Sequence, residues 1–110
     1  MRIHHHESVP NLSPVLRTVL KASGYGGKGV AVHIRPKRRY ANKLTVNGLA
    51  WCTSRKIELF VPRKSLVAEV AAVFQHELDH VEGRLDHKDM TCVDNLVERW
   101  KHVYGEKQCQ

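Results

Sequence analysis

Residues 70–87 read VAAVFQHELDHVEGRLDH, and this stretch predicts the central element of the fold. Residues 65–82 are expected to form a helix whose apolar side chains surround most of its axis, and such a helix is typically buried. Gly83 supplies the stop signal. Because His76 and His80 are four positions apart, the helix brings both imidazoles to one face, one turn above the other.

This pair of histidines predicts a zinc site. Two imidazoles in so apolar a helix need partners, and one zinc ion suits both of them at this spacing. Glu77 is rotated by about 100° around the helix from His76, so it can take a proton from a zinc-activated water without binding the metal. We therefore predict that His76 and His80 bind zinc and that Glu77 is the general base of a hydrolase.

A third protein ligand is expected, because catalytic zinc usually has three protein ligands and one water. His87 is the first candidate, since a short loop after Gly83 can fold it back beneath the helix, and Asp86 is one residue nearer. The rivals are Cys52, from an expected strand beside the helix, and Glu82. For stabilising an oxyanion the sequence offers three candidates without choosing among them: Tyr40, Tyr104 and Arg84.

The remaining pattern predicts an α+β fold. An N-terminal helix is expected to begin at Ser13 and Pro14, because serine caps helices and proline suits their first turn. Strands are expected at residues 30–34, 44–52 and 57–61. They are expected to form a small, mostly antiparallel twisted sheet packed on the central helix, with a C-terminal helix ending near Gly105. We predict one domain over residues 1–110, with a flexible N-terminus at residues 1–12.

Composition narrows the class of protein. The 110 residues, 42% of them hydrophobic, predict one globular domain rather than a disordered chain. No apolar run approaches the roughly 20 residues that cross a bilayer, and the N-terminus lacks the apolar stretch of a secretory signal. The three cysteines are too few and too scattered for a disulfide framework. We therefore expect a cytoplasmic protein without a membrane partner.

The charge balance raises the question of an anionic partner. Net charge is +7 and the isoelectric point is near 9.6. The densest basic stretch lies between Arg35 and Lys43. It can bind nucleic acid through phosphate contacts, or it can be a solvated loop that keeps a small protein soluble.

Residues 70–87 resemble the metal-binding segment of the zincin metallopeptidases, His-Glu-x-x-His-x-x-Gly followed by a third ligand. In family forms with a histidine or aspartate third ligand, that residue comes three positions after the glycine, which is Asp86 here. Short bacterial and phage-type zincins end the motif in His-x-x-Met, similar to residues 87–90, and this favours His87. The resemblance implies a peptidase whose peptide or protein substrate pairs with an edge strand, for which residues 47–52 are the best candidate.

A second resemblance covers a shorter span. Residues 75–83 are similar to the metal-binding helix of peptide deformylases, which take their third ligand from a cysteine. Residues 51–54, WCTS, keep the Cys-x-Ser part of that ligand segment. The implied alternative is a deformylase-like amide hydrolase with Cys52 as the third ligand. Further alternatives are an inactive zincin-like protein and a nucleic-acid-binding module, and the basic segment also resembles that of Spartan-type zincins, which work near DNA.

Overall fold

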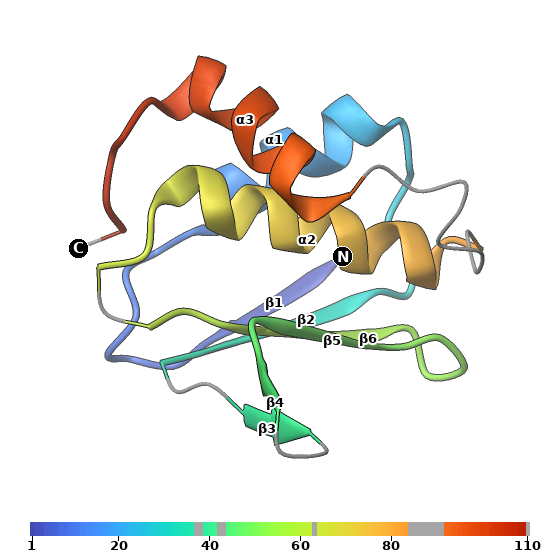
Figure 1. The fold of residues 1–110 in the computed structure, drawn as a ribbon. Helices are drawn as coiled ribbons and strands as arrows, with labels where there is room; N and C mark the ends of the chain where they lie inside the picture. The colour runs from blue at the N-terminus through green and yellow to red at the C-terminus, as the bar shows by residue number, and fades with distance from the viewer. Residues whose placement is uncertain (37–38, 42–43, 63, 84–91, 110) are drawn as a thin grey trace.

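One four-stranded sheet carries the three helices on a single face (Figure 1). The computed structural model describes residues 1–36, 39–41, 44–62, 64–83 and 92–109, with backbone alone at 39–41 and 44–46. In chain order the elements are β1 (Arg2–His5), α1 (Ser13–Ser23), β2 (Ala31–Arg35), β3 (Arg39–Ala41), β4 (Leu44–Val46), β5 (Gly48–Trp51), β6 (Lys56–Phe60), α2 (Val67–Val81) and α3 (Val93–Tyr104). The predicted α+β class is confirmed.

The sheet is mixed, so the prediction of a mostly antiparallel sheet was wrong. Its strand order is β1-β2-β6-β5. β1 is parallel to β2, β2 is parallel to β6, and β5 is antiparallel to β6. For β1 and β2 the physical reason is the connection through α1, which returns the chain to the start of the sheet, as a parallel pair requires. For β2 and β6 the reason is β5, which runs back antiparallel to β6 before the chain enters β6. β3 and β4 form a separate antiparallel hairpin below the sheet (Figure 1).

Strand β1 lies within residues 1–12, the segment for which a flexible N-terminus was expected. β1 pairs with β2 along its whole length, and the amide of Arg2 donates to the carbonyl of Val30 at 2.9 Å. Ile3 packs against the core. His5 Nε2 accepts a hydrogen bond from the amide of Leu12 at 3.0 Å, just before α1 begins. These contacts tie the first residues to both layers of the fold.

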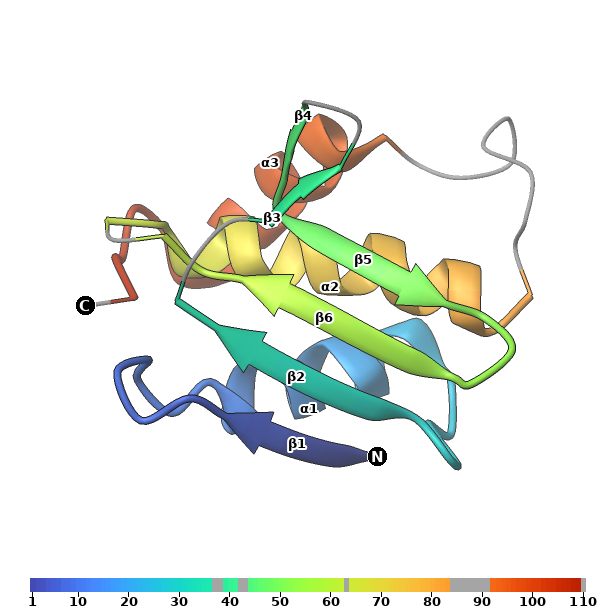
Figure 2. The same ribbon diagram turned by 90° about the horizontal axis from the view of Figure 1, so that it is seen from below.

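Helix α2 is the centre of the molecule, as its sequence predicted. It lies between α3 and the sheet, behind β5 and β6, while α1 lies behind β1 and β2 (Figures 1 and 2). The fully buried side chains on α2 include Phe74 and Leu78. α3 covers α2 with Leu96 and Trp100, and Trp100 Nε1 donates to Gln75 Oε1 at 2.8 Å.

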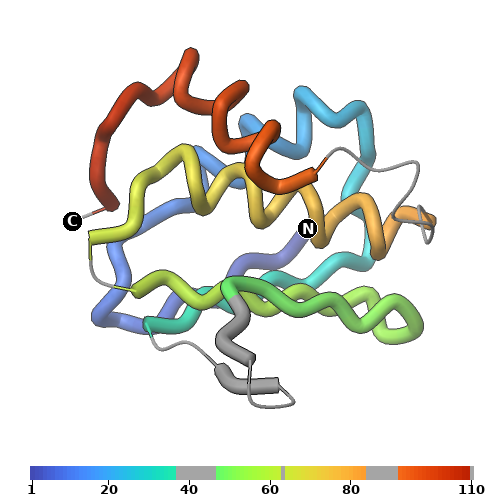
Figure 3. The backbone as a smooth tube through the Cα atoms, viewed as in Figure 1, coloured from blue at the N-terminus to red at the C-terminus, as the bar shows by residue number. Residues whose placement is uncertain are grey.

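The path of the chain brings both ends of α2 against other parts of the fold (Figure 3). Its first turn is held by Glu69, whose carboxylate accepts a hydrogen bond from the amide of Leu66 at 2.9 Å. Next to that turn, the amide of Val67 donates to the carbonyl of Lys107, in the segment after α3, at 2.9 Å.

Within the described part of the chain, no helix is long and apolar enough to cross a bilayer.

Candidate metal and catalytic site

Two imidazoles meet on one face of α2. His76 and His80 are separated by one helical turn, and their Nε2 atoms are 3.3 Å apart. The rings are nearly perpendicular, with an interplanar angle of 84° and centroids 4.8 Å apart. The helical period expected from the sequence therefore brings both Nε2 atoms to one point.

The separation of the two nitrogens fits a shared zinc ion. Zinc binds imidazole nitrogen at about 2.0–2.1 Å in tetrahedral geometry, which sets two ligand nitrogens about 3.3–3.4 Å apart. The observed 3.3 Å matches this value. A hydrogen bond between two neutral rings also has this length, so the geometry suits either partner. A cation can replace that hydrogen bond with little movement of either ring.

Glu77 lies beside these histidines and faces strand β5. A Cβ atom built on Gly48 would stand 3.1 Å from Glu77 Cγ and 2.6 Å from Val73 Cγ1. Only glycine lets the strand approach the helix this closely. Burial disfavours the charged carboxylate and raises the pKa of Glu77 from 4.5 to about 7. Near neutral pH this group can therefore both accept and donate a proton.

β5 is the edge strand of the four-stranded sheet, as was expected for residues 47–52. The amide of Phe60 donates to the carbonyl of Asn47 at 2.9 Å. Hydrogen-bonded positions alternate in an antiparallel ladder, so the backbone groups of Gly48 and Ala50 point away from β6. This outward edge runs alongside α2 next to Glu77.

The turn after β5 contacts the end of α2. Cys52 Sγ donates to the carbonyl of His80 at 3.4 Å. Within the described residues, no group of three or more histidine, cysteine, aspartate or glutamate side chains is arranged to hold a metal ion. Cys52 therefore contacts the backbone of one histidine without joining both imidazoles. Glu82, the other described rival, forms a salt bridge with Arg55.

Most of the remaining candidates, for the third metal ligand and for the oxyanion-stabilising group, are not described by the structure. His87 and Asp86 lie outside the described residues, as does Arg84. The side chain of Tyr40 is also outside them. Tyr104 is described, and it lines a groove with Val67 at the first turn of α2. That turn is nine residues, or about 14 Å, from His76 along the helix. The role of Tyr104 as an oxyanion stabiliser stays a prediction.

Sequence reasoning missed the residues that hold the far end of α2. Arg55 has a left-handed backbone with φ of 53°. Its guanidinium donates to the carbonyl of Lys28 at 3.1 Å and to that of Val81 at 3.4 Å, which satisfies a carbonyl at the helix end. Tyr25 Oη donates to Asp79 Oδ1 at 2.8 Å. These pairs join residues that are 26 to 54 positions apart in the sequence, so no local sequence pattern predicts them.

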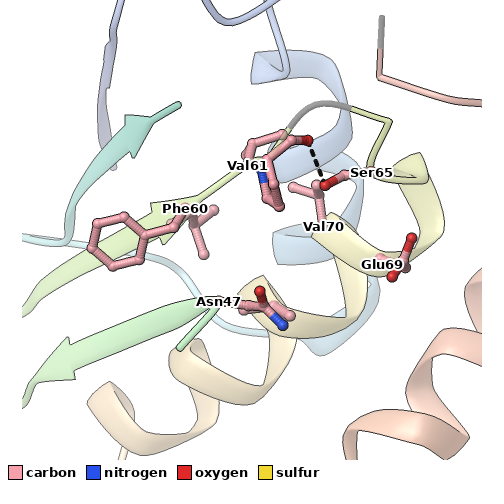
Figure 4. Close-up of a pocket in the computed structure, with 9 residues that line it drawn as sticks. Asn47, Phe60, Val61, Ser65, Glu69 and Val70 are labelled. Carbon is pink, nitrogen blue, oxygen red and sulfur yellow. Dashed lines mark hydrogen bonds between the residues drawn. The ribbon is translucent and has the colours of Figure 1, made fainter. Parts of the chain in front are cut away.

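A pocket opens next to this site, at the start of β5 (Figure 4). Its cavity volume is about 30 Å³. Its lining residues are mostly apolar and include Phe60, Val61, Val70 and Val73, with Asn47, Ser65 and Glu69 as polar groups. Val73 is one helical turn, or about 6 Å, before Glu77. The pocket therefore lies about one helical turn from Glu77 along α2.

Comparison with known proteins adds no family to this description. No protein-family model matches the chain, and no curated protein or solved structure is similar to it at a significant level.

Proposed function

We propose that the protein is a zinc-dependent peptidase of the His-Glu-x-x-His type. The observation that carries this proposal is the 3.3 Å separation of the Nε2 atoms of His76 and His80. Two further features support it. Glu77 adjoins these histidines with a pKa of about 7, and the outward edge of β5 runs beside it.

His76 and His80 would hold the zinc, with His87 as the proposed third ligand. Zinc held by these residues would supply a more acidic water, with a pKa towards about 7, and a Lewis acid for the substrate carbonyl. The chain's own contribution to proton transfer is Glu77. Its carboxylate accepts the proton of the attacking water and then donates it to the nitrogen of the leaving amine.

Substrate orientation follows from the edge strand. An extended peptide can pair with the outward backbone groups of Gly48 and Ala50, as added strands do at open sheet edges. This pairing sets the peptide bond across the face of α2 that carries Glu77. The small pocket one turn away would then receive a short side chain two or three residues from the bond that is cleaved, since an extended chain advances about 3.3 Å per residue.

The first experiment measures metal content and peptide cleavage together. We expect about one zinc per wild-type chain by elemental analysis. His76→Ala and His80→Ala should each lose the metal, while His102→Ala, at an exposed histidine of α3, should keep it. Glu77→Gln should keep the zinc and lose at least about a hundredfold in turnover of a mixed peptide pool. Wild-type protein without zinc, or an active Glu77→Gln variant, would contradict the proposal.

The third ligand separates the peptidase from the deformylase-like alternative. His87→Ala, Asp86→Ala and Cys52→Ser are prepared in parallel and tested for zinc, for peptide cleavage and for release of formate from a formylated peptide. Loss of zinc in His87→Ala alone supports the peptidase. Loss of zinc in Cys52→Ser, with formate release by the wild type, supports the alternative. Zinc-loaded protein that cleaves neither substrate points to an inactive zincin-like protein.

A further inference from the structure

The face of the sheet opposite the helices carries cations and planar rings. Figure 2 shows this face with the helices behind it. Alternation along the strands and the pairing register place ten side chains there, among them Ala31, Leu49, Glu58 and Phe60. The other six we call the open-face cluster: Arg2, His4, His33, Arg35, Trp51 and Lys56. Other apolar side chains of the same strands, such as Val32 and Ile57, point into the core.

The open-face cluster has a surplus of positive charge. Glu58 is the acidic residue that the described strands place on this face, and it is 4% exposed. Arg35 Nε lies 3.1 Å from its carboxylate and Lys56 Nζ lies 3.5 Å from it. The three permanent cations of the cluster, Arg2, Arg35 and Lys56, therefore share this side of the sheet with one buried carboxylate. An anionic partner complements this face, and an acidic peptide or a nucleic acid could provide the charge.

The rings of the cluster favour a nucleic acid. Trp51 is 37% exposed, and Lys56 Nζ lies 5.3 Å from the centre of its ring. On the neighbouring row of the sheet, His4 and His33 stack with centroids 4.6 Å apart and an interplanar angle of 11°. Exposed flat rings among cations are what unpaired bases need, because each base offers a face for stacking and each phosphate a negative charge.

We propose that the open face of the sheet binds single-stranded nucleic acid. Trp51 stacks on a base, the His4–His33 pair offers a second flat surface, and Arg2 with the other cations contacts phosphates. A duplex hides its base faces within its own stack, so it can use the charges but not the rings. Of the basic residues between Arg35 and Lys43, Arg35 is the one whose side chain the structure describes, and it belongs to this cluster. The proposal is independent of the peptidase proposal, because α2 lies on the other side of the sheet (Figure 1).

The test uses the full chain and a fluorescein-labelled oligothymidylate of about 20 nucleotides, which exceeds the usual site size. Fluorescence anisotropy should show binding that weakens as the salt concentration rises. The slope of log K against log salt should be no steeper than about −2, because three cations can contact phosphates of a single strand. Tryptophan emission should be quenched on binding, and unlabelled single strand should compete better than duplex or heparin. Equal competition by all three, without quenching, overturns the proposal because charge alone would then account for binding. Absence of binding at about 50 mM salt also overturns it.

Variants separate stacking from charge while leaving the partners of Glu58 in place. Trp51→Ala should weaken binding by about 5- to 10-fold, whereas Trp51→Phe should retain most of the affinity and lose the quenching. Arg2→Ser should reduce the size of the salt slope by about 0.7. The matched control is Arg17→Ser, at an exposed cation of α1, which should bind like the wild type. Two results would show that the nucleic acid does not lie on this face. One is wild-type affinity in Trp51→Ala, and the other is a loss in Arg17→Ser as large as that in Arg2→Ser.

Discussion

Replacing Glu77 by glutamine should stabilise the metal-free protein above neutral pH. Burial raises the pKa of this carboxyl from 4.5 to about 7. Between these two values the folded protein keeps a proton that the unfolded chain has released, so the free energy of unfolding falls as the pH rises through this window. Each pKa unit corresponds to about 1.36 kcal/mol, which sets an upper limit of about 3.4 kcal/mol for the cost above pH 7.

Partial exposure of Glu77 reduces this limit, and we expect an observed gain of about 2 kcal/mol in Glu77→Gln at pH 8. At pH 4 the carboxyl is protonated in both states, so the gain should vanish. The assay is urea denaturation of chelator-treated protein, followed by circular dichroism at pH 4, 6 and 8. Glu98→Gln, at an exposed glutamate of α3, is the control and should show no such trend. A gain that does not change with pH would refute the reasoning, because it would come from packing rather than from ionisation.

Three further substitutions test how the site is supported. Gly48→Ala should destabilise the protein by about 1 to 3 kcal/mol through overpacking against α2, whereas Gly26→Ala, with no atom within 4 Å of the added carbon, should be nearly neutral in urea denaturation. Leu96→Ala should cost about 2 to 5 kcal/mol, because this α3 side chain is 1% exposed, and Val103→Ala, at 61% exposure, should change the thermal midpoint little. Tyr25→Phe should cost about 1 to 2 kcal/mol by removing the donor to a carboxylate on α2, and unchanged denaturation would show that this bond contributes nothing.

Local patterns in the sequence predicted the helices and their burial well. α2 spans Val67–Val81 where residues 65–82 were expected, because its apolar period and the glycine that follows are local signals. The same period predicted that His76 and His80 share a face. The strand expected over residues 44–52, interrupted at Asn47 and Gly48, is divided into β4 and β5. The edge position of β5 had been expected from the resemblance to zincins.

Strand direction and β1 were not predicted, for a physical reason. The parallel pairs depend on where α1 and β5 return the chain, and that is decided by packing across the whole fold rather than by neighbours in sequence. β1 has the sequence RIHH, in which exposed and partly buried residues alternate. Ile3 is its one apolar residue and packs against the core, so the strand has too little apolar alternation to be predicted from the sequence. The tie between Arg55 and the end of α2 joins distant segments in the same way.

The edge position of β5 also affects how the protein behaves in concentrated solution. The outward amide and carbonyl groups of Gly48 and Ala50 are a template for a strand from any chain, including a second copy of this one. Self-association through this edge would cover Glu77 and the pocket beside it. A peptide paired with this edge would then act as a solubilising ligand, and the protein's tendency to aggregate would rise whenever the edge of β5 was unpaired.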